Sequence, residues 1–300
     1  MSDVIPSMPP EQAVLNQATR ALSIEAQALS EMRDRLQDVQ GPAGQAFVQA
    51  VRMVLACRGR LVVMGMGKSG HVGRKIAATL ASTGTPAMFV HPAEAHHGDL
   101  GMVRPGDVVL AISNSGESEE LTALLPVIKR QGIALLAMTG KPGSALARHA
   151  DVVLDSAVAL EACPLNLAPT ASTTAQMALG DALAVALLDA RGFKAEDFAR
   201  SHPGGSLGRR LLTHLRDVMR TGEAIPRVGP QASFGDLMRE MSAKGLGAAA
   251  VVDADDRVLG VFTDGDLRRR IEAGVDLRTL DAQALMTPAP RTVRDEVLAA

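Results

Sequence analysis

The sequence predicts an α/β protein in which a doubly wound, five-stranded parallel sheet precedes a smaller C-terminal α/β region. Three observations support this prediction. Between residues 43 and 190 short β-rich runs alternate with helical stretches, the runs are apolar at nearly every position, and turn residues bound them. The chain has 300 residues, which is enough for more than one hydrophobic core.

Two helices are expected before the sheet. Apolar residues recur at helical spacing over 11–39, and Gly41-Pro42 separates this helix from a second one over 43–57. The expected strands are Arg60–Met64, Ala87–Val90, Val108–Ile112, Ala134–Met138 and Val152–Leu154. The helices expected between and after them cover 69–82, 117–130, 144–149 and 173–190. Ligands of such sheets bind at the carboxyl ends of the strands, so the loops that follow the strands are where a site is expected.

The pattern changes near Asp217, where a second α/β region begins. Its expected elements are strands at 225–228, 248–252 and 257–262, a helix at 233–243 and a helix that opens at Asp264. The run Leu285-Met286-Thr287-Pro288 loosely echoes Val218-Met219-Arg220-Thr221, which suggests an internal repeat. The expected domains are therefore 1–212, with its core at about 43–190, then 213–274, and then 275–300 as the start of a truncated second copy of the repeat.

Composition limits the ligands and the compartment. The chain has no Trp or Tyr and a formal charge of −2, so we expect neither stacking platforms for bases nor a basic surface for nucleic acid. Cys57 and Cys163 form no C-x-x-C pair, and no apolar run approaches about 18 residues. We therefore expect a cytoplasmic protein without a membrane segment, in which a phosphate ligand needs a local binding site.

Three polar turns at helix starts are candidates for that phosphate site. They are Gly65–Gly70, Ser113–Ser118 and Pro169–Thr174, and helix N-termini present free N–H groups to anions. The side chains expected to bind substrate there are Ser69, Ser113, Asn114, Ser115, Ser118, Ser172 and Thr173. Helix capping is the alternative for each turn alone, but it accounts for one serine of 113–118 and not for three. A dinucleotide site is weakly supported, because no acidic residue ends the next strand.

Titratable side chains follow the same strands. Glu119 and Glu120 follow the serine turn, Glu161 follows the fifth strand, and three histidines, His91, His96 and His97, follow the second. Aldose–ketose isomerisation needs a base beside a carbonyl and an acid for its oxygen, and Glu with His or Lys supplies both. The histidine spacing matches no strong metal signature, and no cofactor is expected.

Several runs together resemble a known family. They are Gly65–Lys75 (GMGKSGHVGRK), Ser82–Pro86 (STGTP), His97–Met102 (HGDLGM), Ile112–Ser118 (ISNSGES), Glu161–Asn166 (EACPLN), Ala168–Thr174 (APTASTT), Ser201–Gly205 (SHPGG) and Phe262–Arg269 (FTDGDLRR). They closely resemble the D-arabinose 5-phosphate isomerases, which are sugar isomerase (SIS) domain enzymes with C-terminal CBS domains. The likeness spans nearly the whole chain.

This resemblance implies conversion of D-ribulose 5-phosphate to D-arabinose 5-phosphate, which supplies Kdo for lipopolysaccharide. It implies that Ser113, Ser115 and Ser118, joined by Ser69, hold the sugar phosphate. The residues that match catalytic positions are Lys68, Glu120, Glu161 and His202. Those that match substrate contacts are Gly84, Thr85, His91 and His97, and His91 also matches a position that can hold an inhibitory zinc.

The resemblance also implies an oligomer. Lys68 and His202 lie at opposite ends of the first domain, so His202 is expected from a neighbouring chain of a homotetramer, with the 11–39 helix as a packing face. In the second region, the resemblance places nucleotide contacts near Thr263, Asp264 and Asp266. A structural or assembly role for this region is the alternative.

Two other functions remain open. A non-catalytic sugar-phosphate sensor of the transcription-regulator type would carry a basic helix-turn-helix, whereas residues 1–40 contain a helix of mixed charge. A sibling isomerase acting on another phosphosugar, in a capsule or hexitol pathway, would share the same motifs.

Overall fold

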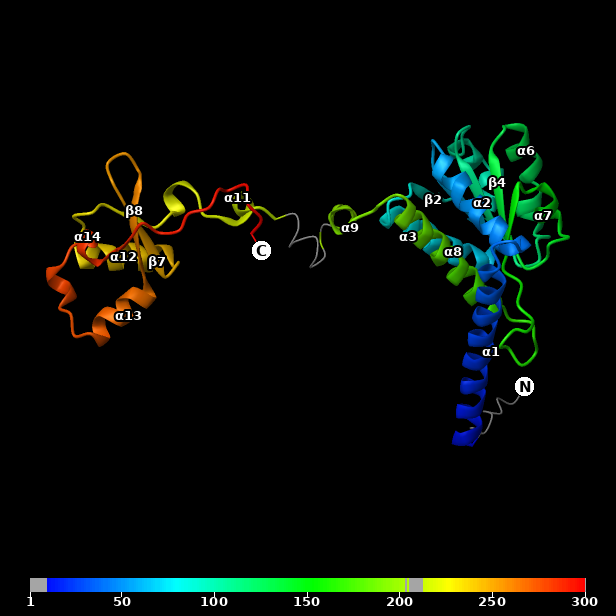
Figure 1. The fold of residues 1–300 in the computed structure, drawn as a ribbon, viewed down its shortest axis with the longest axis horizontal. Coiled ribbons are helices and arrows are strands. Elements are labelled where there is room, and N and C mark those ends of the chain that lie inside the picture. Colours follow the sequence, from blue (N-terminus) through cyan, green and yellow to red (C-terminus); the bar gives the residue numbers. More distant parts are fainter. Residues whose placement is uncertain (1–9, 203, 205–212, 300) are drawn as a thin grey trace, which may run out of the picture. The chain divides into compact units, whose positions relative to one another are not determined.

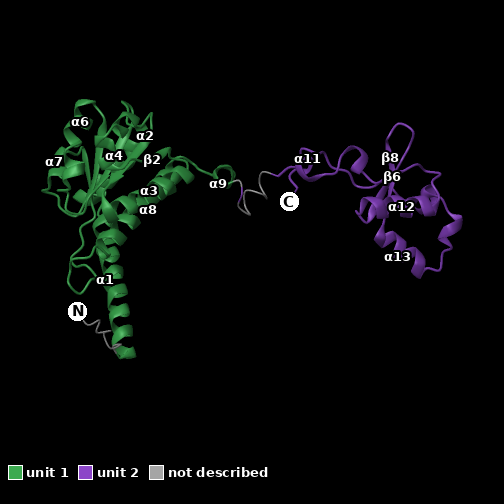
Figure 2. Cartoon of the chain, turned by 180° about the vertical axis from the view of Figure 1, so that it is seen from behind, with its two compact units in different colours: residues 1–202 green, residues 203–300 purple. Residues whose placement is uncertain are grey.

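The computed structural model describes residues 10–202, 204 and 213–299. The chain forms two compact units, residues 1–202 and 203–300 (Figure 1; Figure 2). The division falls ten residues before the domain boundary expected at 212/213, and residues 205–212 lie outside the description. The three-part division into 1–212, 213–274 and 275–300 stays a prediction.

The first unit is built on a five-stranded sheet in which all strands are parallel, as the sequence predicted. The strands are β1 (Leu61–Gly65), β2 (Ala87–Phe89), β3 (Val108–Ile112), β4 (Ala134–Thr139) and β5 (Val152–Asp155). Among the described residues their order is β2-β1-β3-β4-β5. From β1 the chain first adds β2 on one side and then β3, β4 and β5 on the other side. Doubly wound sheets have a crevice for ligands at such a switch point, which here lies between β1 and β3.

Helices cover both faces of this sheet (Figure 1). The face covered by α1 (Glu11–Gln37), α2 (Pro42–Ala56), α3 (Gly67–Ser82) and α8 (Ala171–Ala190) receives Val63, Leu110 and Met138 from the strands. The opposite face, covered by α4 (Pro92–His96), α5 (Glu119–Thr122), α6 (Leu125–Arg130) and α7 (Ala145–His149), receives Val62, Val109 and Leu135. Alternate strand residues therefore fill two separate cores, and this explains why the strands read as continuous apolar runs.

The single helix expected over 117–130 is wrong. The chain forms α5 and α6 instead, with Ala123 and Leu124 between them. Pro126, the second residue of α6, has no N–H to donate to the carbonyl of Thr122, so the helical ladder is interrupted there. A 3₁₀ turn, η1 (Asp99–Met102), follows α4 and was not expected from the sequence.

The helix α8 is long and apolar enough to cross a membrane by length and composition, and half of that stretch is buried inside the unit. It packs against α3, α1 and α2, which is the arrangement of a core helix. A tight turn at Gly192 then leads into α9 (Ala195–Ser201), the last helix of the first unit.

The second unit contains a four-stranded sheet in the order β6-β7-β8-β9 among the described residues. Its elements are α11 (Leu215–Val218), η2 (Gly222–Ala224), β6 (Arg227–Val228), α12 (Phe234–Lys244), β7 (Ala248–Val252), β8 (Val258–Thr263), α13 (Asp264–Glu272), η3 (Leu277–Thr279), α14 (Ala282–Leu285) and β9 (Thr287–Pro288). Its core is formed by Leu237, Met241, Ala249, Phe262, Leu277 and Leu285.

The end of the chain folds back onto this second unit. The strand β9 pairs with β8, and the N–H of Leu215 donates to the carbonyl of Val297 at 2.9 Å. The segments that echo each other in sequence have the same local form, since α11 and α14 are each four residues long and end in an extended methionine, Met219 and Met286.

Candidate active site

The carboxyl ends of the strands bring most of the predicted residues to one edge of the first sheet. Because the strands are parallel, the loops after β1, β2, β3 and β5 all leave at this edge. These loops carry Lys68, His91, Ser113 and Glu161, and the serine turn continues to Glu120. These predicted positions therefore share one edge, although they are spread over more than 90 residues of sequence.

The turn after β1 presents a lysine and a serine at the start of α3. Gly67 has a φ of +52°, a conformation that a residue with a side chain rarely adopts, and it turns the chain directly into the helix. Lys68 follows as an exposed side chain, and its ammonium group forms no ion pair within the described part of the chain. The Ser69 hydroxyl donates to Oε1 of Gln176 on α8 at 3.1 Å, which ties the two helix starts together.

The serine turn after β3 is held by its own hydroxyls. Ser113, which is buried, accepts the N–H of Gly116 at 3.1 Å, and Ser115 accepts the N–H of Glu117 at 3.3 Å. Both hydroxyls act as acceptors in these contacts, so each keeps its hydrogen for a further acceptor such as a phosphate oxygen. Asn114 contributes its carbonyl to the N–H of Gly140 at 3.1 Å, which joins the turns after β3 and β4.

Glu120 lies where the serine turn, residues 113–118, meets the segment after β2 that carries His91, His96 and His97, which we call the histidine loop. Its Oε2 accepts the Ser118 hydroxyl at 3.0 Å, and its carbonyl accepts Nε2–H of His96 at 2.8 Å. Hydrogen bonds from the backbone and from Ser118, with a smaller contribution from the charges of His91 and His96, lower the pKa of Glu120. The Glu120 side chain is therefore an exposed, ionised carboxylate at neutral pH.

Glu161 is bound at the N-terminus of α8. Its Oε2 accepts the N–H of Thr170 at 2.8 Å, the Thr170 hydroxyl at 3.0 Å and the N–H of Ser172 at 3.2 Å. Partial burial raises the pKa of Glu161, but these hydrogen bonds with Thr170 and Ser172 outweigh it, and the net pKa is lowered. One oxygen of this carboxylate is thus fixed by the helix start, and Oε1 has no hydrogen bond among the described residues.

The third polar turn is more closed than the sequence suggested. Ser172 is fully buried and its hydroxyl has no hydrogen-bond partner in the described structure, while the Thr173 hydroxyl donates back to the carbonyl of Thr170 at 2.8 Å. One turn further along α8, Gln176 is also fully buried, and its Nε2 has no partner among the described residues. Sequence reasoning missed Thr170 and Gln176 as site residues; a single amide on the apolar face of α8 was the available signal for Gln176.

Two groups of predicted residues lie at the other edge of the sheet. Gly84 and Thr85 precede β2, so they lie at the amino end of the strands. His202 follows α9, which comes after the C-terminal end of α8, whereas Glu161 is bound at the N-terminal end. The 20 residues of α8 span about 30 Å, so one chain does not bring His202 to Glu161.

The histidine loop shows no metal centre among the described residues. His97 caps the C-terminus of α4 and is exposed, and His91 is half-buried and lies edge-on to the Phe89 ring. Across the residues that the structure describes, no three His, Cys, Asp or Glu side chains are grouped so that they could hold a metal ion. The zinc position at His91 stays a prediction.

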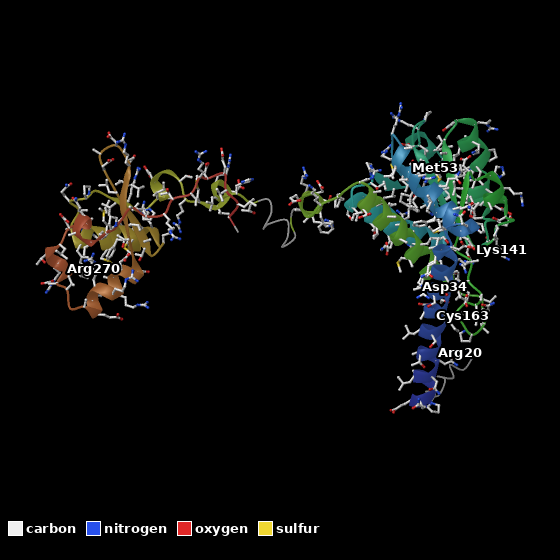
Figure 3. All side chains as sticks on the ribbon, in the orientation of Figure 1. Arg20, Asp34, Met53, Lys141, Cys163 and Arg270 are labelled. Atoms are coloured by element: carbon white, nitrogen blue, oxygen red, sulfur yellow. The ribbon has the colours of Figure 1, made fainter. Side chains whose placement is uncertain are left out.

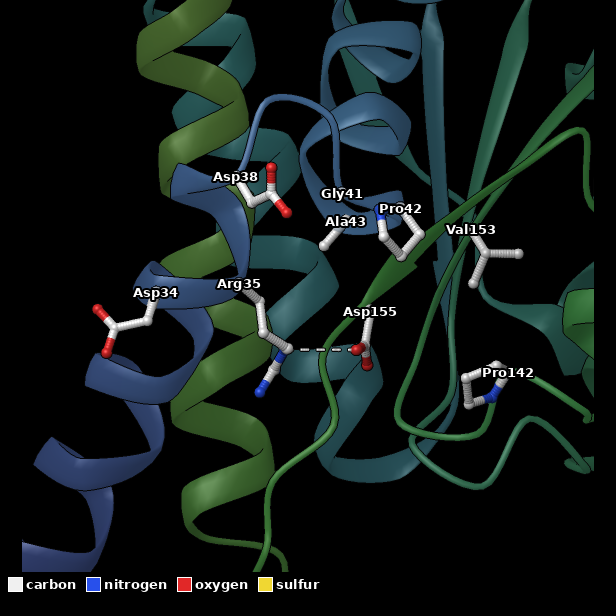
Figure 4. A pocket seen from close by; sticks show the side chains of 9 residues that line it. All are labelled: Asp34, Arg35, Asp38, Gly41, Pro42, Ala43, Pro142, Val153 and Asp155. Atoms are coloured by element: carbon white, nitrogen blue, oxygen red, sulfur yellow. Dashed lines mark ion pairs between the residues drawn. The ribbon is translucent and has the colours of Figure 1, made fainter.

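A cavity of about 650 Å³ lies beside the turn between α1 and α2 (Figure 4). The Arg35 Nε lies 3.4 Å from Asp155 Oδ2 there, and the Arg35 Nη2 donates to the carbonyl of Ala157 at 2.9 Å. These contacts anchor the base of the 156–170 loop, which carries Glu161 and Cys163 and runs along α1 (Figure 3). None of the predicted site residues lines this cavity. A smaller one, of about 380 Å³, is lined by Ser115 and by the 140–144 loop after β4.

In the second unit the predicted nucleotide contacts bind one another. Thr263 and Asp266 form a reciprocal cap at the start of α13, with the Thr263 hydroxyl donating to Asp266 Oδ2 at 2.7 Å. Asp266 Oδ1 also accepts from Arg269 at 2.7 Å and from Thr287 at 3.2 Å. These contacts stabilise the start of α13, and both nucleotide binding and a structural or assembly role of the region stay predictions.

Comparison with known families identifies both units. Residues 54–186 match the SIS domain family, and residues 215–273 match the CBS domain family. The chain is thus a SIS-domain protein with a CBS domain after it.

Comparison with individual proteins shows which family of SIS-domain proteins the chain belongs to. The arabinose 5-phosphate isomerase KdsD of Pseudomonas aeruginosa is 55% identical over 95% of this chain and 86% of its own length. KdsD of Escherichia coli K12 is 56% identical over 93% of this chain and 83% of its own length. The chain belongs to the KdsD arabinose 5-phosphate isomerase family, as its motifs predicted. An E. coli CFT073 protein solved in complex with arabinose 5-phosphate aligns with a TM-score of 0.61 and 40% identity, over 65% of this chain and all of that one.

Proposed function

We propose that the protein interconverts D-ribulose 5-phosphate and D-arabinose 5-phosphate and so supplies Kdo for lipopolysaccharide synthesis. The observation that carries the proposal is the edge where the loops after β1, β3 and β5 present Lys68, the serine turn, Glu120 and Glu161 in a chain of this family. The neighbouring protein solved with arabinose 5-phosphate supports the same class of substrate.

Serine hydroxyl groups at this edge of the sheet would bind the phosphate of the substrate. Ser113 and Ser115 keep free hydroxyl hydrogens and would donate them to the phosphate of an open-chain pentose. Ser69 and Ser118 would join them by turning their hydroxyl hydrogens from Gln176 and Glu120 to the phosphate. Lys68 adds an ammonium group without an ion pair in the described chain at the start of α3. A phosphate fixed there leaves C1 and C2 of the sugar to be placed toward the carboxylates.

The reaction moves one hydrogen from carbon to carbon and one from oxygen to oxygen. An ionised carboxylate, Glu120 or Glu161, takes the C2 proton of the aldose, and the electron pair forms the C1–C2 double bond of an enediolate while O1 becomes negative. The O2 hydroxyl loses its proton and O1 gains one, and the carboxylic acid returns its proton to C1, which yields the ketose. Lys68 or His202 would stabilise and protonate the developing oxyanion.

We propose that His202 comes from a neighbouring copy. The imidazole Nδ1 lies 3.2 Å from the carbonyl of Phe198, which can only accept, so Nδ1 carries the hydrogen and Nε2 faces away from that contact. Because the length of α8 separates His202 from Glu161, an active site with both residues needs two chains. A homotetramer, in which α1 offers the exposed apolar residues Val14, Leu15 and Leu22, would supply them.

Two further parts of the proposal concern the location of the protein and its regulation. A cytoplasmic location fits the phosphosugar substrate and the two free thiols, Cys57 and Cys163. A nucleotide at the CBS domain would have to displace the contacts between Thr263 and Asp266. A thermal-shift screen with adenine and cytidine nucleotides tests this, because a specific ligand raises the melting temperature.

The deciding experiment is an isomerase assay. The protein is incubated with D-ribulose 5-phosphate, with D-arabinose 5-phosphate and with hexose phosphates, with a chelator present throughout. We expect exchange between the two pentose phosphates alone. Exchange of a hexose phosphate instead would identify a sibling isomerase, and tight phosphosugar binding without exchange would identify a sensor.

A further inference from the structure

At the amino edge of the first sheet, the turn before β2 holds the segment that leads to His202. The Arg191 Nε donates to the Thr85 hydroxyl at 3.2 Å. Phe193 covers the neighbouring Gly84, where an added Cβ would lie 2.5 Å from Cδ2 of the ring. Residues more than 100 positions apart in sequence are therefore in direct contact at the point where the chain leaves α8.

Gly84 and Thr85, in the turn before β2, are closely covered at this contact. Thr85 is 2% exposed, and together with Arg191, Val54 and Leu61 it lines a small cavity of about 150 Å³. Gly84 has a φ of +90°, so both its backbone conformation and the ring of Phe193 exclude a side chain at this position.

The segment beyond the contact has little other support. Within α9, all of whose residues are described, only Ala199 is buried. Lys194 caps the start of α9, with its N–H donating to Asp197 at 2.9 Å, and His202 caps the end of the helix. The His202 ring stacks on Phe198 with 4.0 Å between centroids, so the imidazole is held against α9, and the residues that hold the chain at Thr85 and Gly84, Arg191 and Phe193, directly precede α9.

We propose that Thr85 and Arg191 are positioning residues for catalysis, which seat α9 on the 83–86 turn so that His202 reaches the active site of a neighbouring copy. This inference rests on the proposed role of His202. It gives Arg191, which no sequence motif singled out, an effect on turnover that acts through Thr85 and α9.

The test is a set of matched variants assayed as full chains. Thr85→Val removes the hydroxyl and keeps the shape, Thr85→Ser keeps the hydroxyl, and Arg191→Met removes the donor from an exposed residue. We expect Thr85→Val and Arg191→Met each to lower kcat by about tenfold or more with little change in KM, since small displacements of a catalytic group are costly. Thr85→Ser should retain activity, and the double variant should lose no more than either single one.

A cycle with His202→Ala separates positioning from substrate contact. In the His202→Ala background, neither Thr85→Val nor Arg191→Met should lower kcat further, because the group that they position is gone. Full turnover of Arg191→Met beside an impaired Thr85→Val would overturn the inference in favour of direct substrate contact by Thr85. Further loss in the His202→Ala background would also overturn it. Full turnover of His202→Ala itself would instead refute the role of His202 in the proposed function.

Discussion

The starts of α8 and α13 use a carboxylate in opposite ways. In the second unit, Asp266 belongs to the helix that it caps, and Thr263, Arg269 and Thr287 occupy its oxygens. In the first unit, Glu161 comes from ten residues before α8, and only its Oε2 is occupied by described residues. The carboxylate at the α13 start has both oxygens hydrogen-bonded, whereas at the α8 start, which we call the open site, Glu161 Oε1 has no hydrogen bond among the described residues.

The α8 start also contains buried polar groups that lack hydrogen-bond partners within the described structure. The Ser172 hydroxyl and Nε2 of Gln176 are buried at the α8 start without partners in the described part of the chain. A buried polar group without a hydrogen bond costs roughly 1–3 kcal/mol, so such groups are rare and call for an explanation. They lie beside the proposed site residues, since Gln176 accepts from Ser69 and the N–H of Ser172 donates to Glu161, whereas the Thr263 hydroxyl and the Asp266 carboxylate at the α13 start are hydrogen-bonded to each other.

Loss of the carboxylates should have the largest effect of any change at the open site. Glu161→Gln and Glu120→Gln keep side-chain size but remove the base, so at least one should lower turnover by roughly 10²–10⁴-fold. The measurement is steady-state kcat with D-arabinose 5-phosphate, with the melting temperature as the folding control. Near-normal turnover in both variants would refute acid/base catalysis at this edge.

Removal of the hydroxyl that joins α3 to α8 should have a smaller effect, mainly on substrate affinity. Ser69→Ala deletes a proposed phosphate donor and the partner of Gln176, and we expect KM to rise about tenfold. Ser30→Ala on α1, whose hydroxyl donates to the carbonyl of Ala26 in its own helix, is the matched control. An unchanged KM in Ser69→Ala would exclude this serine from the phosphate site.

The pH profile should shift when the hydrogen bond to Glu120 is removed. Backbone hydrogen bonding and the Ser118 hydroxyl lower the pKa of Glu120, so its carboxylate stays ionised to lower pH than an ordinary glutamate. If Glu120 is the base, the acidic limb of kcat against pH should lie below the usual range, and Ser118→Ala should move it to higher pH. A limb that does not move in this variant would assign the base role to Glu161.

Loss of the Asp266 carboxylate at the start of α13 should lower the stability of the second unit and leave turnover almost unchanged. Burial raises the pKa of Asp266, but hydrogen bonds from Thr263, Arg269 and Thr287 outweigh it and lower the pKa overall. A lowered folded pKa stabilises the second unit above the unfolded pKa, and this stability is lost as pH falls through the folded value. We expect Asp266→Asn to destabilise that unit by ~1–3 kcal/mol at neutral pH and less in acid, as followed by denaturant unfolding. Equal stability at pH 7 would contradict this account.

The sequence predicted the parts of the fold that depend on local patterns. Apolar runs located all the strands of the first sheet to within a residue or two, but the helix over 117–130 failed because one proline interrupted it. Residues at strand ends, such as Lys68 and Glu161, could be assigned to one edge because parallel strands end together.

Long-range pairing could not be read in the same way. No local sequence pattern indicates that Arg191 contacts Thr85 or that Gln176 contacts Ser69. Nor does one indicate that the side chain of Ser172 is fully buried at the start of α8. These contacts depend on how α8 lies on α3 and on the sheet. The location of Gly84 and Thr85 before β2, at the edge away from Lys68, was available from strand order and chain direction once the sheet was parallel.

The most direct test of a site shared between copies is activity in a mixed assembly. Glu161→Gln and His202→Ala chains, each of low activity alone, are unfolded together in equal amounts and refolded. Random assembly gives about a quarter of the sites an intact Glu161 from one chain and an intact His202 from its neighbour, so we predict recovery of about a quarter of the native turnover. Activity no higher than that of the separate variants would contradict the shared site.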